Sequence, residues 1–289
     1  MTSKKNVTHQ ECRIPVIYIL GVAHSGTTLT DLLLGSHSHI ESLGEVHKYW
    51  WFCSRHSPRL AKKCRCTCGE LISNCAFWNG VRQQLEEIAG SDEVDLEARD
   101  TATFEAANRD LFRAAAKYTG KSVICDSSKW SGRLRRLLGS DAFDVHIVHL
   151  VRDGRAVASS YRKRGKFAFG AALRWQAVNL TWRYFSLLRR KAASYCLIRY
   201  EDLVADPEGN LKQIMGPLGL AFEPEQIQYR EPAHHNISGN AMKIDPERTH
   251  IQLDTQYLSD LSPWQWWSYT LGATPGLTFL RYPWRRRVT

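Results

Sequence analysis

The stretch IPVIYILGVAHSGTT, residues 14–28, decides the fold of this chain. Its apolar run Ile14–Leu20 predicts a buried strand, because a strand covered by helices on both faces is apolar throughout. Gly21 and Gly26 bound the loop that follows, and a helix is predicted from Leu29 to Gly35. A strand, a glycine-bounded loop and a helix N-terminus together cradle a phosphate on backbone N–H groups. The stretch therefore predicts an anion site at the end of the first strand.

The loop lacks one residue that triphosphate-binding loops carry. Its G-x4-G spacing is that of a nucleotide P-loop, but Thr27 stands where an ATPase or kinase has its Walker lysine. That lysine reaches the β- and γ-phosphates, and the next Ser or Thr holds Mg²⁺. A cradle without the lysine suits a ligand with a single 5′-phosphate group. The residues predicted to contact it are His24, Ser25, Gly26, Thr27 and Thr28.

Short apolar runs alternate with helical segments along the rest of the chain. Further strands are predicted at Ser122–Asp126, Val145–Val151 and Tyr195–Tyr200. This alternation indicates the α/β class, here a P-loop-like central parallel sheet flanked by helices. Residues 37–75 are rich in His, Cys, Ser and Trp and are predicted to form a long loop or a Cys-rich cap insertion.

Length and composition describe an ordinary globular protein. We predict a single domain over residues 1–289, with residues 37–120 as a cap or insertion within it. No run reaches about 18 apolar residues, the length of a transmembrane helix. The polar N-terminus also lacks the apolar segment of a secretory signal. We therefore expect a soluble, cytoplasmic protein with no transmembrane segment.

The net charge of +10 favours anionic partners. Basic residues gather in four clusters: Arg133/Arg135/Arg136, Arg162–Lys166, Arg189–Lys191 and Arg285–Arg287. A solvated basic face that aids solubility is the alternative for each cluster. No nucleic-acid-binding motif accompanies the charge, so nucleic acid is not an expected partner.

A second candidate anion site lies in HLVRDGRAVASSYRKR, residues 149–164. Arg152 follows a predicted strand, and Ser160 lies eight residues later in the next helix. Eight residues of helix turn through about 800°, so Ser160 lies within about 80° of the direction in which Arg152 would point from the same helix. A guanidinium binds oxyanions through paired hydrogen bonds, so the two side chains suit a second phosphate. An arginine at a strand end near an unrelated helical serine is the alternative.

GVAHSGTT followed by VRDGRAVASSYR resembles the pair of phosphate-binding motifs of the sulfotransferase family. That family uses 3′-phosphoadenosine 5′-phosphosulfate (PAPS) as its sulfonate donor. The resemblance implies that the first loop holds the 5′-phosphosulfate, and that Arg152 with Ser160 holds the ribose 3′-phosphate. It extends over about residues 14–245, through SHSHIESLGE, IRYEDLVADPEGNLKQI and HNISGNAMKI, and CRCTCGELISNCAFW resembles bacterial-type members. Many relatives carry Lys or Arg at the position of His24, where an imidazole can still donate a hydrogen bond.

The resemblance also implies catalytic residues. We expect in-line transfer of a sulfonate to a hydroxyl acceptor, which demands mainly positioning and electrostatics and no metal. Glu45, in LGEVHKY, corresponds to the base of the tyrosyl-protein type of sulfotransferase, and His47 is an alternative base. Lys129 is predicted to neutralise charge on the sulfonate or leaving phosphate, and His24 to contact the bridging oxygen or 5′-phosphate.

Asn240 and Lys243 are weaker candidates, in a late loop that would cover the nucleotide. Gly-Asn pairs also occur in plain turns. The acceptor stays open between a carbohydrate, a phenol, a lipid and a peptide tyrosine. Two other functions also stay open, a P-loop nucleotide kinase or phosphotransferase and a non-catalytic binder of an acidic polymer. The missing Walker lysine opposes the kinase.

Four of the eight cysteines lie close together in CRCTCGELISNC, at Cys64, Cys66, Cys68 and Cys75. Thiolates at short spacing can close a tetrahedral zinc site, but this spacing is not that of a standard zinc finger or ribbon. Free thiols, or one local disulfide such as Cys68 with Cys75, are the alternatives. No metal ligand is assigned from the sequence.

Overall fold

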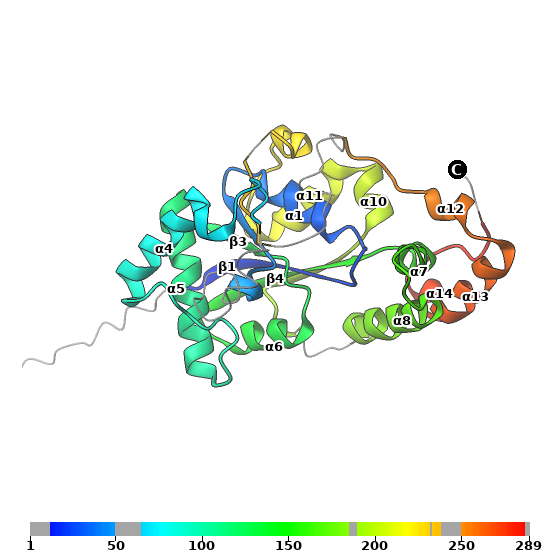
Figure 1. The fold of residues 1–289 in the computed structure, drawn as a ribbon, viewed down its shortest axis with the longest axis horizontal. Helices are drawn as coiled ribbons and strands as arrows, with labels where there is room; N and C mark the ends of the chain where they lie inside the picture. The colour runs from blue at the N-terminus through cyan, green and yellow to red at the C-terminus, as the bar shows by residue number, and fades with distance from the viewer. Residues whose placement is uncertain (1–11, 50–64, 185–189, 232, 238–249, 287–289) are drawn as a thin grey trace, which may run out of the picture.

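Within the residues that the structure describes, five parallel strands form a central sheet with helices on both faces (Figure 1). The computed structural model describes residues 12–49, 65–184, 190–231, 233–237 and 250–286. The strands are β1 (Ile14–Gly21), β2 (Ile40–Gly44), β3 (Val123–Asp126), β4 (Phe143–Val151) and β5 (Ser194–Arg199), in the order β2-β3-β1-β4-β5. The predicted α/β class with a P-loop-like parallel sheet is confirmed.

Helices connect the strands and cover the sheet. They are α1 (Thr27–Gly35), α4 (Ala76–Ala89), α5 (Thr101–Thr119), α6 (Ser131–Gly139), α7 (Gly154–Arg162), α8 (Ala168–Tyr184), α10 (Tyr200–Ala205), α11 (Pro207–Met215), α12 (Gln256–Asp260), α13 (Pro263–Ala273) and α14 (Gly276–Phe279). Figure 1 shows α1, α10 and α11 on one face of the sheet and α5 and α6 on the other.

The apolar run of β1 is buried from both sides. Val16 and Tyr18 pack into one hydrophobic core with residues of α4, α5 and α6. Ile17 and Ile19 point the other way, into a second core with residues of α1, α10 and α11. Alternate side chains of a strand face opposite sides of a sheet, so a central strand with two cores must be apolar at successive positions.

The strand β2 lies inside the stretch predicted as a loop or cap insertion, and that prediction was wrong for residues 40–44. They pair in parallel with β3 at the edge of the sheet. The sequence IESLG conceals the strand because two polar side chains interrupt it. Both side chains are buried and partnered: Glu41 pairs with Lys121 at 3.2 Å, and the Ser42 hydroxyl donates to Asp31.

The order of the strands places a topological switch at β1. From β1 the chain crosses through α1 to β2 at one edge, whereas after β3 it crosses to β4 on the other side of β1. In open α/β sheets, ligands bind outside the carboxyl ends of the strands at such a point. The loops after β1, β2, β3 and β4 all leave this edge, because the strands are parallel.

The predicted basic cluster at residues 133–136 is only partly a surface feature. Arg133 is fully buried, and its Nε donates to Asp126 Oδ2 at 2.8 Å. Its two terminal nitrogens donate to Asn108 and Glu97, each at 2.5 Å. A guanidinium committed to internal acceptors cannot serve an outside anion, so the prediction was wrong for this residue.

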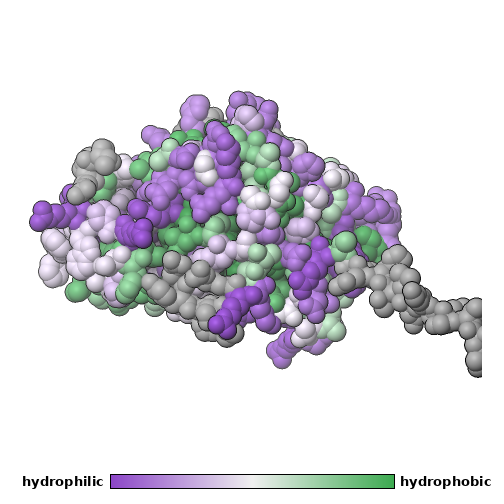
Figure 2. Space-filling view, turned by 180° about the vertical axis from the view of Figure 1, so that it is seen from behind, coloured by the Kyte–Doolittle hydropathy of each residue, from purple (hydrophilic) through white to green (hydrophobic). Residues whose placement is uncertain are grey.

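A third hydrophobic core joins α7, α8, α13 and α14 beside the sheet. Trp266 is buried there, whereas Trp264 and Trp267 in the same helix are exposed. Figure 2 shows hydrophilic residues over much of one face of the molecule, with smaller hydrophobic areas between them. No helix in the described residues has the length and apolar character needed to cross a membrane.

Candidate active site

The loop between β1 and α1 forms an open cradle at the carboxyl edge of the sheet. Helix α1 begins at Thr27, and no side chain caps its first N–H groups. Its N-cap, Gly26, has a φ of 90°. A Cβ atom there would lie 2.3 Å from the ring of Tyr200, so glycine is required for both backbone and space. Uncapped N–H groups at a helix N-terminus bind an anion well.

Ser25 adds a side-chain donor to this cradle. The residue is fully buried, and its hydroxyl has no hydrogen-bond partner among the described residues. Buried polar groups are nearly always hydrogen-bonded, and an exception often marks a place for a ligand. The neighbouring Thr27 and Thr28 are also buried. The loop therefore places buried hydroxyl groups beside the uncapped N–H groups of α1, and its role in binding a phosphate stays a prediction.

Positive charges surround the loop. Burial, together with nearby positive charges, lowers the pKa of His24 to about 4. Those charges belong to Arg164, Lys129, Arg152 and Lys166. The imidazole is therefore neutral near pH 7 unless a bound anion offsets these cations. The same cations attract an anionic ligand to the loop.

Arg152 links the second anion site to the first. This side chain is buried, its Nη1 donates to the backbone carbonyl of His24 at 3.2 Å, and its guanidinium lies 4.7 Å from the ring centroid of Tyr200. Its Nη2 lies 3.0 Å from Asp254 Oδ2 and also donates to the Asp254 carbonyl at 2.9 Å. A carboxylate thus occupies one side of the guanidinium that the sequence predicts to hold a phosphate.

Ser160 lies in the last turn of α7, where its hydroxyl donates to the Ala156 carbonyl at 3.0 Å. Among the described residues no hydrogen bond joins it to Arg152. Arg164 binds the Ser160 carbonyl at 2.9 Å, which brings another cation to this turn. The adjacent Ser159 is buried with a hydroxyl that has no partner in the described chain, which adds a donor that the sequence did not single out.

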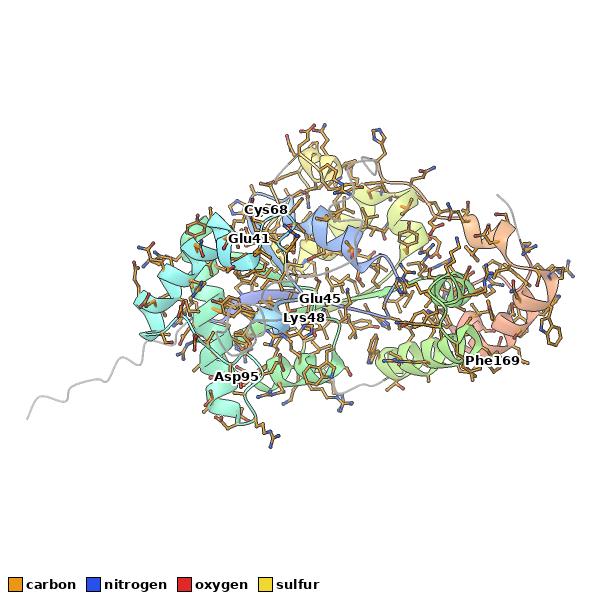
Figure 3. The ribbon with its side chains drawn as sticks, in the orientation of Figure 1. Glu41, Glu45, Lys48, Cys68, Asp95 and Phe169 are labelled. Atoms are coloured by element: carbon orange, nitrogen blue, oxygen red, sulfur yellow. The ribbon has the colours of Figure 1, made fainter. Side chains whose placement is uncertain are left out.

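Glu45 and Lys129 meet because β2 and β3 are neighbours and their loops leave the same edge. Lys129 Nζ lies 2.9 Å from Glu45 Oε1, and Lys48 pairs with the other carboxylate oxygen. Burial alone would raise the pKa of Glu45, but the two ammonium groups outweigh it and hold the pKa at about 2. Figure 3 shows Glu45 and Lys48 together near the centre of the molecule.

His47 lies in the short 3-10 helix η1 (Val46–Lys48) that follows β2. Burial is the main cause that lowers its pKa to about 4, so it too is neutral near pH 7. Its Nδ1 is buried and has no partner within the described residues, while its backbone N–H donates to Ser128 Oγ at 3.3 Å. The predicted residues Asn240 and Lys243 lie outside the described residues.

Sequence reasoning missed three partners of the predicted side chains. Lys48 is the second cation on Glu45, Asp254 the anion on Arg152, and Tyr200 the ring against the loop glycine. One signal was available for Lys48, since a lysine three residues after a glutamate in a helical turn can reach it. The contacts of Asp254 and Tyr200 join distant parts of the chain and leave no local pattern.

This fold, with an uncapped helix N-terminus at the switch point and cationic side chains beside it, defines a P-loop-like α/β protein. A family model described as the Sulfotransferase family matches residues 15–224. That match spans well over half of the chain, so the protein belongs to the Sulfotransferase family. The family and the fold support a sulfotransferase function, and the resemblance of the two motifs is confirmed.

Two solved structures share the fold. The sulfotransferase domain from the Synechococcus PCC 7002 olefin synthase has a TM-score of 0.58 and 21% identity, with 94% of this chain and 97% of that chain covered. The sulfotransferase domain from the curacin biosynthetic pathway has a TM-score of 0.54 and 19% identity, with coverage of 94% and 99%. No curated protein matches the chain.

Proposed function

We propose that this protein transfers a sulfonate group from PAPS to a hydroxyl acceptor by in-line displacement. The observation that carries the proposal is the link between the two anion sites. The uncapped N-terminus of α1 forms the first site, and Arg152, bonded to the carbonyl of His24 within the cradle loop, provides the second. A ligand with phosphate groups at both its 5′ and 3′ positions requires two such sites a short distance apart.

The cradle suits the 5′-phosphosulfate. The α1 N–H groups and the Ser25 hydroxyl would bind its oxygens, and Lys129 would contribute positive charge. With Thr27 in place of the Walker lysine, the loop lacks the cation that serves a triphosphate. His24, neutral near pH 7, would donate one hydrogen bond to the bridging oxygen or the 5′-phosphate.

The second site suits the ribose 3′-phosphate. Arg152 would bind it through its guanidinium, and the hydroxyl of Ser160 would donate to another of its oxygens. Asp254 holds the guanidinium when the ligand is absent, so its carboxylate must move away when the phosphate arrives. Two like charges on one guanidinium repel each other, and the phosphate carries more charge than the carboxylate.

Glu45 is the proposed general base. The acceptor oxygen attacks the sulfur, the bond from sulfur to the bridging oxygen breaks, and the acceptor proton passes to the Glu45 carboxylate. Paired with two lysines, that carboxylate is a weak base with a pKa of about 2. When Lys129 turns toward the sulfonate or leaving phosphate, the carboxylate loses part of this stabilisation and its pKa rises toward a useful value.

Calorimetric titration of the full chain with adenosine 3′,5′-bisphosphate, AMP and ATP without metal tests the donor class. We expect the bisphosphate to bind at least about tenfold more tightly than AMP, because a charge-assisted contact contributes about 1.5–3 kcal/mol. Arg152→Ala should abolish this preference, whereas Arg135→Ala, an exposed arginine on α6, removes equal charge and should retain it. Equal affinity for AMP and the bisphosphate would overturn the donor proposal.

Labelled PAPS then tests the reaction, with carbohydrate, phenol, lipid and tyrosine-peptide acceptors. Transfer of label to a hydroxyl is the expected result. Mg²⁺-dependent turnover of ATP would instead favour a kinase. Salt-sensitive binding of an acidic polymer, unaffected by the bisphosphate, would favour a non-catalytic binder.

A further inference from the structure

Four metal-binding side chains from separate parts of the chain converge beside the sheet. They are Cys66, Cys68, Cys75 and His235, whose ligand atoms all lie within 4.8 Å of one another. The sequence brings the three cysteines near each other, but His235 lies about 160 positions later and arrives only through the fold. All three thiols are free, and Figure 3 marks the position of Cys68.

Four of the six distances between these ligand atoms are close to those of a tetrahedral zinc site, and the other two do not exceed 4.8 Å. Zn–S and Zn–N bonds of about 2.3 and 2.05 Å place tetrahedral sulfurs about 3.8 Å apart and a sulfur and a nitrogen about 3.5 Å apart. Cys75 Sγ lies 3.6 Å from Cys66 Sγ and 3.7 Å from Cys68 Sγ. His235 Nδ1 lies 3.3 Å from Cys75 Sγ and 3.6 Å from Cys66 Sγ.

Two backbone N–H groups and a helix N-terminus face the sulfurs of the cluster. Burial raises the pKa of the Cys66 and Cys75 thiols, and the backbone N–H of Cys68 toward Cys66 and that of Trp78 toward Cys75 oppose this effect in part. Cys75 is also the N-cap of α4, where the helix dipole favours negative charge. Gly69, with a φ of 92°, closes the turn between the first two cysteines by donating to the Cys66 carbonyl at 2.9 Å.

The fourth ligand is held in place independently of any metal. The ring of His235 stacks on Phe77 with centroids 4.8 Å apart and planes 3° apart. The indole of Trp78 donates to the His235 carbonyl at 2.7 Å. The stacking on Phe77 and the hydrogen bond from Trp78 fix the orientation of this imidazole. Its Nδ1 therefore faces the sulfurs without further reorganisation.

We propose that Cys66, Cys68, Cys75 and His235 bind one structural Zn²⁺. A donor set of three sulfurs and one nitrogen at tetrahedral spacing selects zinc among the common metals. Four protein ligands leave no position open for water or substrate, so the metal is structural and takes no part in the sulfonate transfer. A disulfide accounts for only two of the three thiols and gives no role to His235.

The zinc would secure the segment that supports Glu45. Next to His235 and Asn236, Ile237 donates to the Leu43 carbonyl at 3.0 Å, and its own carbonyl accepts from the Glu45 N–H at 2.8 Å. Ile237 also bridges to Cys66. The metal would therefore tie the turn at residues 66–69, the start of α4 and the backbone beside Glu45 into one unit.

The test measures zinc in the full chain, purified without chelator, by elemental analysis and native mass spectrometry. We expect about one zinc per chain in the wild type and less than about 0.2 in Cys68→Ser, whose exposed side chain leaves the core intact. Cys12→Ser, another exposed thiol far from the cluster in the sequence, is the matched control and should keep the metal. Cobalt exchanged into the site should give the visible bands of tetrahedral thiolate coordination.

A stability measurement keeps the proposal testable if a variant folds poorly. A chelator should lower the Tm of the wild type and of Cys12→Ser but leave that of Cys68→Ser unchanged, because only a metal that binds the native state stabilises it. Two results for the wild type would overturn the proposal. One is a chain without zinc whose thiols are free, and the other is a chain without zinc whose mass is two hydrogens lower because a disulfide has formed. Zinc retained in Cys68→Ser at the wild-type level would overturn this ligand set.

Discussion

The ammonium of Lys129 lies 2.9 Å from Glu45 Oε1, so the two side chains predicted to serve catalysis form an ion pair with each other. Each charge lowers the reactivity of the other in this arrangement. The carboxylate is ionised but weakly basic, and the ammonium is already partnered. A ligand that draws Lys129 away frees both at once, which couples binding of the donor to activation of the base.

Glu45→Gln should separate catalysis from donor binding. The amide keeps the size of the side chain but cannot accept the acceptor proton, so kcat should fall about 10²–10⁴-fold. The dissociation constant for adenosine 3′,5′-bisphosphate should not rise and should fall by less than about threefold, because Glu45 reaches the proposed phosphate sites only through its ion pair with Lys129. Turnover of labelled PAPS measures kcat, and calorimetry measures the dissociation constant. Glu225→Gln, at an exposed position, is the control. Equal losses of affinity and turnover would contradict this division of roles.

Lys129→Met should change the pH profile of kcat/KM in a defined direction. A general base works above its pKa and loses activity as pH falls through it. With a pKa of about 2 in the free protein, Glu45 causes no acid loss between pH 5 and 8. Without Lys129, only the ammonium of Lys48 opposes the effect of burial, so the pKa of the Glu45 carboxyl group rises. The loss of kcat/KM at acid pH should then appear at about pH 5. The double variant, with Lys129→Met and Glu45→Gln, should no longer lose activity at acid pH. If the double variant keeps the same loss as Lys129→Met alone, Glu45 is not the group that causes it.

Features carried by local sequence could be predicted, and features carried by tertiary contact could not. The apolar run 14–20 and the glycines after it indicate the central strand and cradle without further information. The strand β2 was hidden because Glu41 and Ser42 find buried partners that no local pattern reveals. Buried polar side chains with long-range partners look like surface residues in a sequence.

The candidate site divides in the same way. The position of Arg152 after β4 follows from the alternation of strands and helices, since parallel strands share one carboxyl edge, whereas Glu45 was indicated by the family resemblance and not by a predicted strand. The Asp254 carboxylate on Arg152 and the His235 imidazole near the cysteines come from segments that contact the sheet only in the folded chain. Sequence spacing alone therefore gave Cys64, Cys66, Cys68 and Cys75 as candidates, of which Cys64 lies outside the described residues, and it did not indicate His235.

Asp254→Asn should tighten binding of the bisphosphate. The substitution removes the negative charge that competes for Arg152 while leaving the backbone carbonyl contact in place. The dissociation constant should fall about two- to fivefold, since a partly exposed ion pair is worth at most about 1 kcal/mol. Calorimetry measures this, and Asp260→Asn, which breaks the surface pair with Lys163, is the matched control. Weaker binding in Asp254→Asn would mean that the carboxylate positions the guanidinium instead of competing for it.

Arg133→Met should destabilise the fold because it leaves buried acceptors without a donor. Arg133 is fully buried, and its guanidinium satisfies Asp126, Asn108 and Glu97 at the base of the turn that carries Lys129. Removing one partner of a buried ion pair costs about 3–5 kcal/mol, because the remaining carboxylate is left uncompensated. Urea unfolding measures the loss, and Arg135→Met on the exposed side of α6 should change the free energy of unfolding by less than about 0.5 kcal/mol. A small effect for Arg133→Met would show that water reaches Asp126 and replaces the guanidinium.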